Sequence, residues 1–115
     1  MEEKIFKSIS DIPPVATAHN QGKKFVFLAN EDTATKITQF AVGEFMPGEE
    51  CEEHIHKTME ECFYFLSGEG IYTIDGVNYP LKEGVFLRIP AGKPHNLVAI
   101  GTEKLRFVYY GVATE

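Results

Sequence analysis

The stretch that decides the fold is residues 48–68, with the sequence GEECEEHIHKTMEECFYFLSG. His54 and His56 are separated by one residue, so their side chains project from the same face of a β-strand, because strand side chains alternate with period two. If residues 57–60 form the turn of a hairpin, His56 lies opposite Glu61 on the returning strand. Two imidazoles and one carboxylate then converge on one point, and these donors suit a divalent transition metal ion.

A second stretch, residues 84–99, supplies a fourth donor of the same kind. Its sequence is GVFLRIPAGKPHNLVA, in which a short apolar run leads into a Pro-Ala-Gly turn and then into His95. Fifteen residues separate this stretch from the first one. The length of 115 residues is near the usual size of a single domain.

These two stretches resemble the motifs of a known family. The first resembles the first cupin motif, G-x5-H-x-H-x4-E-x6-G, at every anchor: Gly48, His54, His56, Glu61 and Gly68. The second resembles the second cupin motif, G-x5-P-x-G-x2-H-x3-N, at Gly84, Pro90, Gly92 and His95. It departs at the last anchor, where Ala99 stands in place of the family's Asn. The resemblance implies an all-β fold, a double-stranded β-helix or jelly-roll barrel.

The resemblance also implies one divalent transition metal ion, held by His54, His56, Glu61 and His95. This ligand set admits Mn, Fe, Co, Ni, Cu or Zn. Because an imidazole must be neutral to donate its lone pair, we expect metal binding to weaken as the pH falls through about 6.5. We expect Glu61 to titrate at lower pH than the histidines.

Glu60 competes with Glu61 for the carboxylate position. Glu61 makes the six-residue spacing to Gly68, and it shares strand parity with the apolar residues Phe63 and Phe65. We therefore expect Glu61 to face the metal and Glu60 to be a solvated turn residue. His19, which has no partner in register, is expected to lie outside the site.

The chain reads as an N-terminal arm, residues 1–22, followed by a single barrel, residues 23–115. No window of helical length has apolar residues at helical spacing. Asp75-Gly76 is a type I′ hairpin signal between two of the segments. Many short strands punctuated by turns are typical of a sandwich or barrel. The expected strands are residues 25–29, 36–45, 51–56, 61–66, 71–74, 77–81, 85–89, 97–100 and 105–112.

Composition excludes several function classes. The net charge of −6 over 115 residues argues against nucleic-acid binding, because no basic cluster could neutralise a run of phosphates. No apolar run approaches about 18 residues, so we expect no membrane span, and the N-terminus carries no signal-peptide pattern. Cys51 and Cys62 have the opposite parity to the ligands on their own strands. We interpret both as free thiols that point away from the metal in a cytoplasmic protein.

Two segments point to assembly. Residues 62–66 and 25–29 are apolar at both parities, so both faces of these strands need cover. A small barrel has only one interior. We predict a homodimer that covers the outer face, with the N-terminal arm as the alternative cover.

The predicted function is that of a metal-binding cupin acting on a small, oxygen-rich molecule. Proteins of this kind include dioxygenases, oxidases, decarboxylases and isomerases, so a metal-dependent enzyme, such as an oxidoreductase, is the first hypothesis. The alternative is a non-enzymatic module that binds or senses a small molecule or a metal. Phe63, Phe65 and Arg88 are candidate pocket residues. Arg88 has two open readings, since it can bind an anionic substrate or lie outward and pair with an acid.

Overall fold

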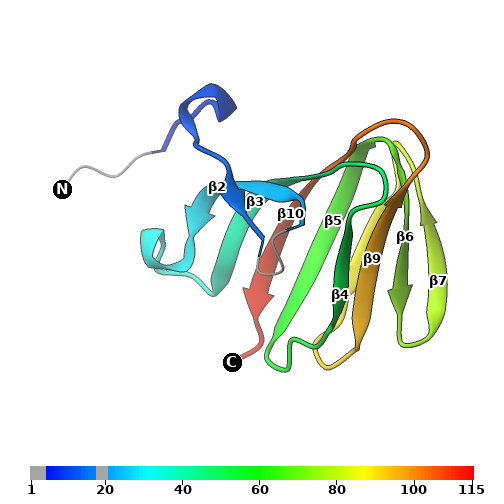
Figure 1. Ribbon diagram of the computed structural model, residues 1–115. Coiled ribbons are helices and arrows are strands. Elements are labelled where there is room, and N and C mark those ends of the chain that lie inside the picture. Colours follow the sequence, from blue (N-terminus) through cyan, green and yellow to red (C-terminus); the bar gives the residue numbers. More distant parts are fainter. Residues whose placement is uncertain (1–4, 18–20) are drawn as a thin grey trace.

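The structure is a computed structural model of the chain, and it describes residues 5–17 and 21–115 (Figure 1). The described residues form β-strands and two short 3₁₀ helices, η1 (Ile9–Asp11) and η2 (Asn30–Asp32), and no α-helix. The strands are β1 (Val15–Ala16), β2 (Lys23–Ala29), β3 (Ile37–Phe45), β4 (Glu50–His54), β5 (Met59–Ser67), β6 (Glu69–Ile74), β7 (Val77–Leu81), β8 (Phe86–Ile89), β9 (His95–Ile100) and β10 (Leu105–Ala113). The all-β prediction is confirmed. None of the described helices is long and apolar enough to cross a membrane.

The strands make two antiparallel sheets. The larger has the order β1-β2-β3-β10-β5-β8 and the smaller has the order β4-β9-β6-β7. Consecutive strands repeatedly change sheet, as between β3 and β4, β4 and β5, and β9 and β10 (Figure 1). This is the double-stranded β-helix predicted from the sequence.

The core lies between the two sheets. Phe63, Phe65 and Phe107 enter it from the larger sheet, and Tyr72 and Leu97 enter it from the smaller one. Along β5 the alternation is clean, because Phe65 has no exposed surface whereas its neighbour Tyr64 is 47% exposed. The apolar residues of this strand thus divide between the core and the outer face of the larger sheet.

The predicted hairpin between the two halves of the first motif is wrong. β4 pairs with β9, while β5 pairs with β10 and β8, so the two segments lie in different sheets. Residues 55–58 cross from one sheet to the other. The alternation of side chains along each segment does not determine which strand lies beside it, and here each segment pairs with strands that are distant in the sequence.

The hairpin between β6 and β7 forms as predicted. Asp75 and Gly76 have φ values of 49° and 81°, which is the left-handed backbone that a type I′ turn needs at both central positions. Ile74 pairs with Val77 directly beside the turn.

β2 begins at Lys23, directly after the predicted N-terminal arm. Within the arm, Val15 pairs with Lys24 and Ala16 pairs with Lys23, so this part of the arm extends the larger sheet at its edge. Earlier in the arm, Ile5 and Phe6 are exposed. The division of the chain into an arm and a barrel stays a prediction.

Candidate metal centre

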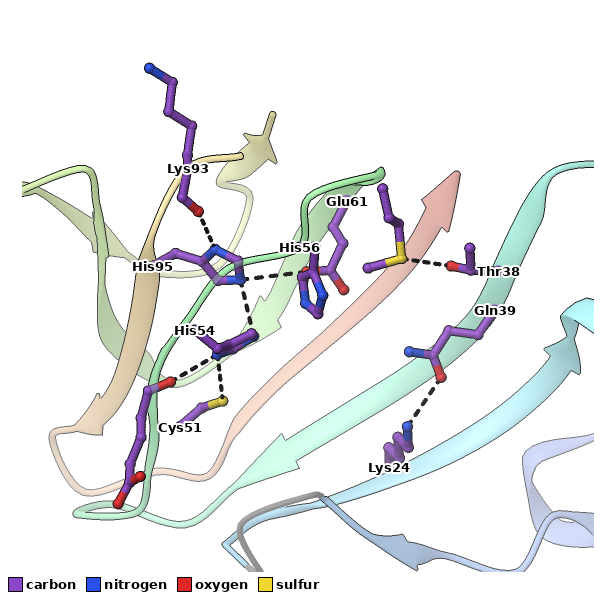
Figure 2. Close-up of polar contacts among 11 residues, drawn as sticks. Lys24, Thr38, Gln39, Cys51, His54, His56, Glu61, Lys93 and His95 are labelled. Carbon is purple, nitrogen blue, oxygen red and sulfur yellow. Dashed lines mark hydrogen bonds and ion pairs between the residues drawn. The ribbon is translucent and has the colours of Figure 1, made fainter. Parts of the chain in front are cut away.

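The four predicted ligands come from different parts of the barrel and meet at one of its ends (Figure 2). His54 is the last residue of β4 and His95 is the first residue of β9, and the two are paired directly across the smaller sheet. Glu61 lies on β5, in the larger sheet. His56 lies in the connection between β4 and β5. The site therefore joins both sheets.

Three histidines could hold a metal ion, because one ring nitrogen from each of His54, His56 and His95 lies within 4.8 Å of the others. The Nε2 atoms of His54 and His95 are 3.0 Å apart. Oε1 of Glu61 is 3.5 Å from Nε2 of His56 and 3.8 Å from Nε2 of His95. Donors about 2 Å from a common ion lie roughly 3–4 Å from one another. The cluster is thus already close to the spacing that an ion requires.

Hydrogen bonds fix the tautomers of two of the histidines. Nδ1 of His54 lies 2.8 Å from the carbonyl oxygen of Glu52, and Nδ1 of His95 lies 2.8 Å from that of Lys93. A carbonyl only accepts, so each Nδ1 carries a proton and donates it. In a neutral ring this leaves the lone pair on Nε2. In two neutral rings the Nε2 lone pairs would face each other at 3.0 Å, an arrangement that a bound metal ion or a proton shared between the rings would stabilise.

A backbone contact holds the connection that carries His56. The amide of Gly92 donates to the carbonyl oxygen of His56 at 2.8 Å, which links this connection to the turn before β9. Gly92 has φ of 84°, a conformation that L residues with a side chain rarely adopt. The glycine thus shapes the turn and places His56 beside His95.

The titration of these groups differs from the sequence-based expectation. Burial raises the pKa of Glu61 from 4.5 to about 7, and the positive charge of Lys24 partly opposes this rise. Burial and the neighbouring histidines His54 and His95 lower the pKa of His56 to about 4. Burial also lowers the pKa of His95. In the metal-free protein the pKa of Glu61 therefore lies above that of His56, the reverse of the order expected from the sequence, because the desolvation of the buried carboxylate was not visible there.

The donor set fits a divalent transition metal ion. Three neutral imidazoles and one carboxylate would leave a net charge of about +1 on the filled site. A low pKa keeps His56 and His95 unprotonated near neutral pH, so protons compete weakly with an ion for these nitrogens. Four protein donors also leave one or two positions for water or a ligand on an ion that prefers five or six.

Cys51 lies closer to this site than the strand parity predicted. Its Sγ is 3.8 Å from Nδ1 of His54, and its side chain packs against the core. The register between β4 and β9 shifts between Cys51 and His54, so these residues, three apart, both turn inward. Such a β-bulge breaks the alternation on which parity arguments depend. The prediction that Cys51 points away from the metal site is therefore wrong, although Cys51 and Cys62 are both free thiols, as expected.

The candidate pocket residues separate into two groups. Phe63 and Phe65 face the interior and belong to the core. The ring of Phe63 lies 5.3 Å from that of Tyr72, which lies 6.1 Å from the His95 ring. Contact of Phe63 or Phe65 with a bound molecule stays a prediction.

Arg88 lies on the outer face of the larger sheet. Its Nη2 is 3.0 Å from Oε1 of Glu60, and its side chain is about half exposed, whereas its neighbours Leu87 and Ile89 are buried. The prediction that Arg88 is a pocket residue is therefore wrong, and the alternative, an outward side chain paired with an acid, is confirmed. The same pair explains why Glu60 is turned away from the ligands and Glu61 is turned toward them.

Two polar residues near the site were not predicted from the sequence. Nζ of Lys24 donates to Oε1 of Gln39 at 3.3 Å, and both side chains appear in the close-up of the site (Figure 2). In the sequence Lys24 directly precedes an apolar run, and a lysine in that place is expected to be solvated. Only the pairing of β2 with β3 places it on an inward-facing position. His19 lies outside the described residues.

Comparison with known proteins identifies the family. The cupin domain family matches residues 41–111, which is more than half of the chain. The protein belongs to the cupin family.

Several relatives share this domain. The chain is 41% identical over 78 residues to the dimethylsulfoniopropionate lyase DddW of Ruegeria pomeroyi, covering 68% of this chain and 50% of the lyase. It is 28% identical over 104 residues to the oxalate-binding protein of Thermotoga maritima, covering 86% of each chain. The crystal structure of a predicted oxalate decarboxylase, also from Thermotoga maritima, superposes with a TM-score of 0.86 at 24% identity. That superposition covers 95% of this chain and 99% of the other. The chain spans about half the length of the first curated relatives it matches.

Proposed function

We propose that this protein is a metal-dependent cupin that binds one divalent transition metal ion through His54, His56, Glu61 and His95 and acts on a small, oxygen-rich molecule. The observation that carries the proposal is the pair of Nε2 lone pairs of His54 and His95, which face each other at 3.0 Å while both Nδ1 atoms donate to carbonyls. Glu61 supplies the negative charge beside them. An ion bound there would act as a Lewis acid, or would hold a ligand in its open positions.

The residues around the site have defined tasks in this proposal. The carbonyls of Glu52 and Lys93 hold the rings of His54 and His95 in the tautomer that donates through Nε2. Glu61 is 7% exposed, so it acts in a largely water-free environment. Tyr72 and the core rings beside it form the apolar floor under His95. These features favour an ordered site in which Glu61 is shielded from bulk water, whereas the side chain of His56 is 35% exposed and borders the solvent.

Metal binding is tested with a matched pair of carboxylate variants. We expect Glu61→Ala and His56→Ala to lower the affinity for Mn²⁺ or Zn²⁺ at least tenfold, because each removes one of four donors. Glu60→Ala removes the adjacent carboxylate, which pairs with Arg88 on the outer face, and should change the affinity less than twofold. Titration calorimetry and elemental analysis give the readout. Full metal occupancy in both the Glu61→Ala and His56→Ala proteins would contradict the assignment.

Enzyme activity is the finer part of the proposal. The match to a lyase at 41% identity supports catalysis. The longer match to an oxalate-binding protein favours the alternative of a binding or sensing module. Turnover of dicarboxylates, diketones and catechols by the protein reloaded with each metal distinguishes the two. Consumption that disappears in His56→Ala supports an enzyme, and tight binding without consumption supports a module.

We also propose that the protein is a homodimer. The outer face of the larger sheet carries four exposed aromatic residues, Phe40, Tyr64, Phe86 and Tyr110, around a groove of about 190 Å³. The described part of the N-terminal arm leaves this face open, since Tyr64 remains 47% exposed. A second copy would bury these rings. A reducing, cytoplasmic location is proposed as well, supported by the free thiols of Cys51 and Cys62.

A further inference from the structure

Lys24 lies on an inward-facing position of the larger sheet. It pairs with Gly43 on β3. A Cβ atom added at Gly43 would point into the ring of Phe107, a core residue, so this position faces the interior. Lys24 therefore shares the inner face of the sheet. Lys23, one residue earlier, has the opposite orientation and lies 3.8 Å from Glu44, a residue of the outer face.

Gln39 lies in the same row of the sheet as the proposed metal ligand Glu61. Both residues pair with Gly111 of β10, from opposite sides. Two strand spacings separate their backbones, which is on the order of 10 Å. Gln39 also shares the parity of Ala41, which is fully buried. Its side chain is thus on the face that carries the metal centre, and the amide lies between Lys24 and the ligands in the close-up (Figure 2).

The two side chains form a donor pair. Nζ of Lys24 donates to Oε1 of Gln39 at 3.3 Å, so the oxygen of the amide is fixed toward the ammonium group. The NH₂ group of Gln39 then points away from Lys24 and offers two donors. The ammonium group has further N–H donors as well. A cation and an amide NH₂ together suit the oxygens of a carboxylate.

The positive charges on the inner face indicate that the ligand is an anion. A filled metal centre carries about +1, and Lys24 adds another positive charge on the same inner face. We propose that Lys24 and Gln39 bind the distal carboxylate of a small dicarboxylate whose other carboxylate occupies the open positions of the metal centre. This inference rests on the proposed metal-binding function and extends it to a substrate or ligand class. Lys24 is a positioning residue here, since it holds the end of the molecule that does not touch the metal.

A series of acids of increasing length tests this inference by binding alone. The probes are acetate, oxalate, malonate, succinate and glutarate, titrated by calorimetry into the Mn²⁺-loaded protein. Acetate and oxalate end at the metal, so their affinities should change less than threefold in Lys24→Met. At least one longer diacid should bind at least tenfold more weakly to Lys24→Met. Lys24→Arg should restore most of the loss, because it keeps a cation at this position.

Lys23→Met is the matched control, because it removes the same charge from the neighbouring residue on the outer face. It should leave every affinity unchanged. An equal loss for all five probes in Lys24→Met, or no loss for any, would overturn the inference, as would failure of the Mn²⁺ protein to bind any diacid. The metal content of His56→Ala separates this result from the proposed function. If His56→Ala loses the metal but Lys24→Met changes no affinity, the proposed metal site is supported and only the dicarboxylate inference is overturned.

Discussion

Replacing Glu61 with Gln should stabilise the metal-free protein at alkaline pH, although it removes a proposed ligand. Burial raises the pKa of this carboxyl from 4.5 to about 7. Between these pH values the folded protein holds a proton that the unfolded chain has released, so stability falls as the pH rises. Glutamine keeps the shape of the protonated acid and carries no charge to desolvate. The variant therefore escapes this loss.

The rise of about 2.5 pH units, from 4.5 to about 7, corresponds to about 3 kcal/mol at about 1.4 kcal/mol per unit. The difference between the two proteins should be small at pH 5 and should approach about 3 kcal/mol at pH 8. The contribution of His56 to stability changes with pH in the opposite direction. Its pKa is lowered to about 4, so its contribution to stability grows as the pH rises from about 4 to 6.5. Nε2 of His56 lies 3.5 Å from Oε1 of Glu61, so the replacement also changes the titration of His56. At pH 8 His56 is neutral in both the folded and the unfolded protein, and the comparison at that pH isolates Glu61.

Urea unfolding in EDTA at pH 5, 6, 7 and 8 gives the free energy of unfolding of both proteins. Glu60→Gln is the control. The side chain of Glu60 is 33% exposed, and its hydrogen bond to Arg88 lowers its pKa, so this variant should gain no stability at pH 8. Added Mn²⁺ should reverse the order, since the ion stabilises the protein that binds it more tightly. A Glu61→Gln protein no more stable than wild type at pH 8 would refute the reasoning.

Two further changes test the assembly and a turn. Changing Tyr64 and Leu66 together to Lys should convert a dimer to monomer or aggregate in sedimentation velocity, and a wild-type protein that sediments as a monomer at micromolar concentration would contradict the dimer. Gly68→Ala should cost at least about 2 kcal/mol in urea unfolding, because φ is 79° and the new Cβ would clash with the carbonyl oxygen of Lys104. Gly48→Ala, with φ of 91° and open space around the new Cβ, should cost about 1 kcal/mol. Equal losses would show that the contact with Lys104 is unimportant.

Most of the strands could be predicted from the sequence, whereas β1 and the two 3₁₀ helices were not. The strand ranges are within a few residues of those observed, because apolar β-prone runs and turn residues are local signals. The Asp75-Gly76 turn follows from two residues alone. The orientation of Glu61 toward the core, and of Glu60 away from it, followed from parity along a strand without a bulge at that point.

Strand pairing and burial were harder to predict from the sequence. The hairpin prediction failed because the period of side chains along a strand says nothing about which strand lies beside it. The inward turn of Cys51 depends on a bulge that appears only when β4 pairs with β9. The pKa of Glu61 and the inward position of Lys24 depend in the same way on neighbours from distant strands. Each of these properties belongs to the packed barrel.

The four residues predicted as metal ligands nevertheless lie close together, and the strand pairing explains why. His54 is aligned with His95 by the pairing of β4 and β9, and Glu61 is aligned by the pairing of β5 with β10. His56 is held by the amide of Gly92. The four residues between His56 and Glu61 in the first motif thus cover most of the connection from one sheet to the other. Gly92 of the second motif holds this connection beside His95 through its hydrogen bond. An ion at this point would tie the two sheets together, so its binding would stabilise the end of the barrel as well as serve chemistry.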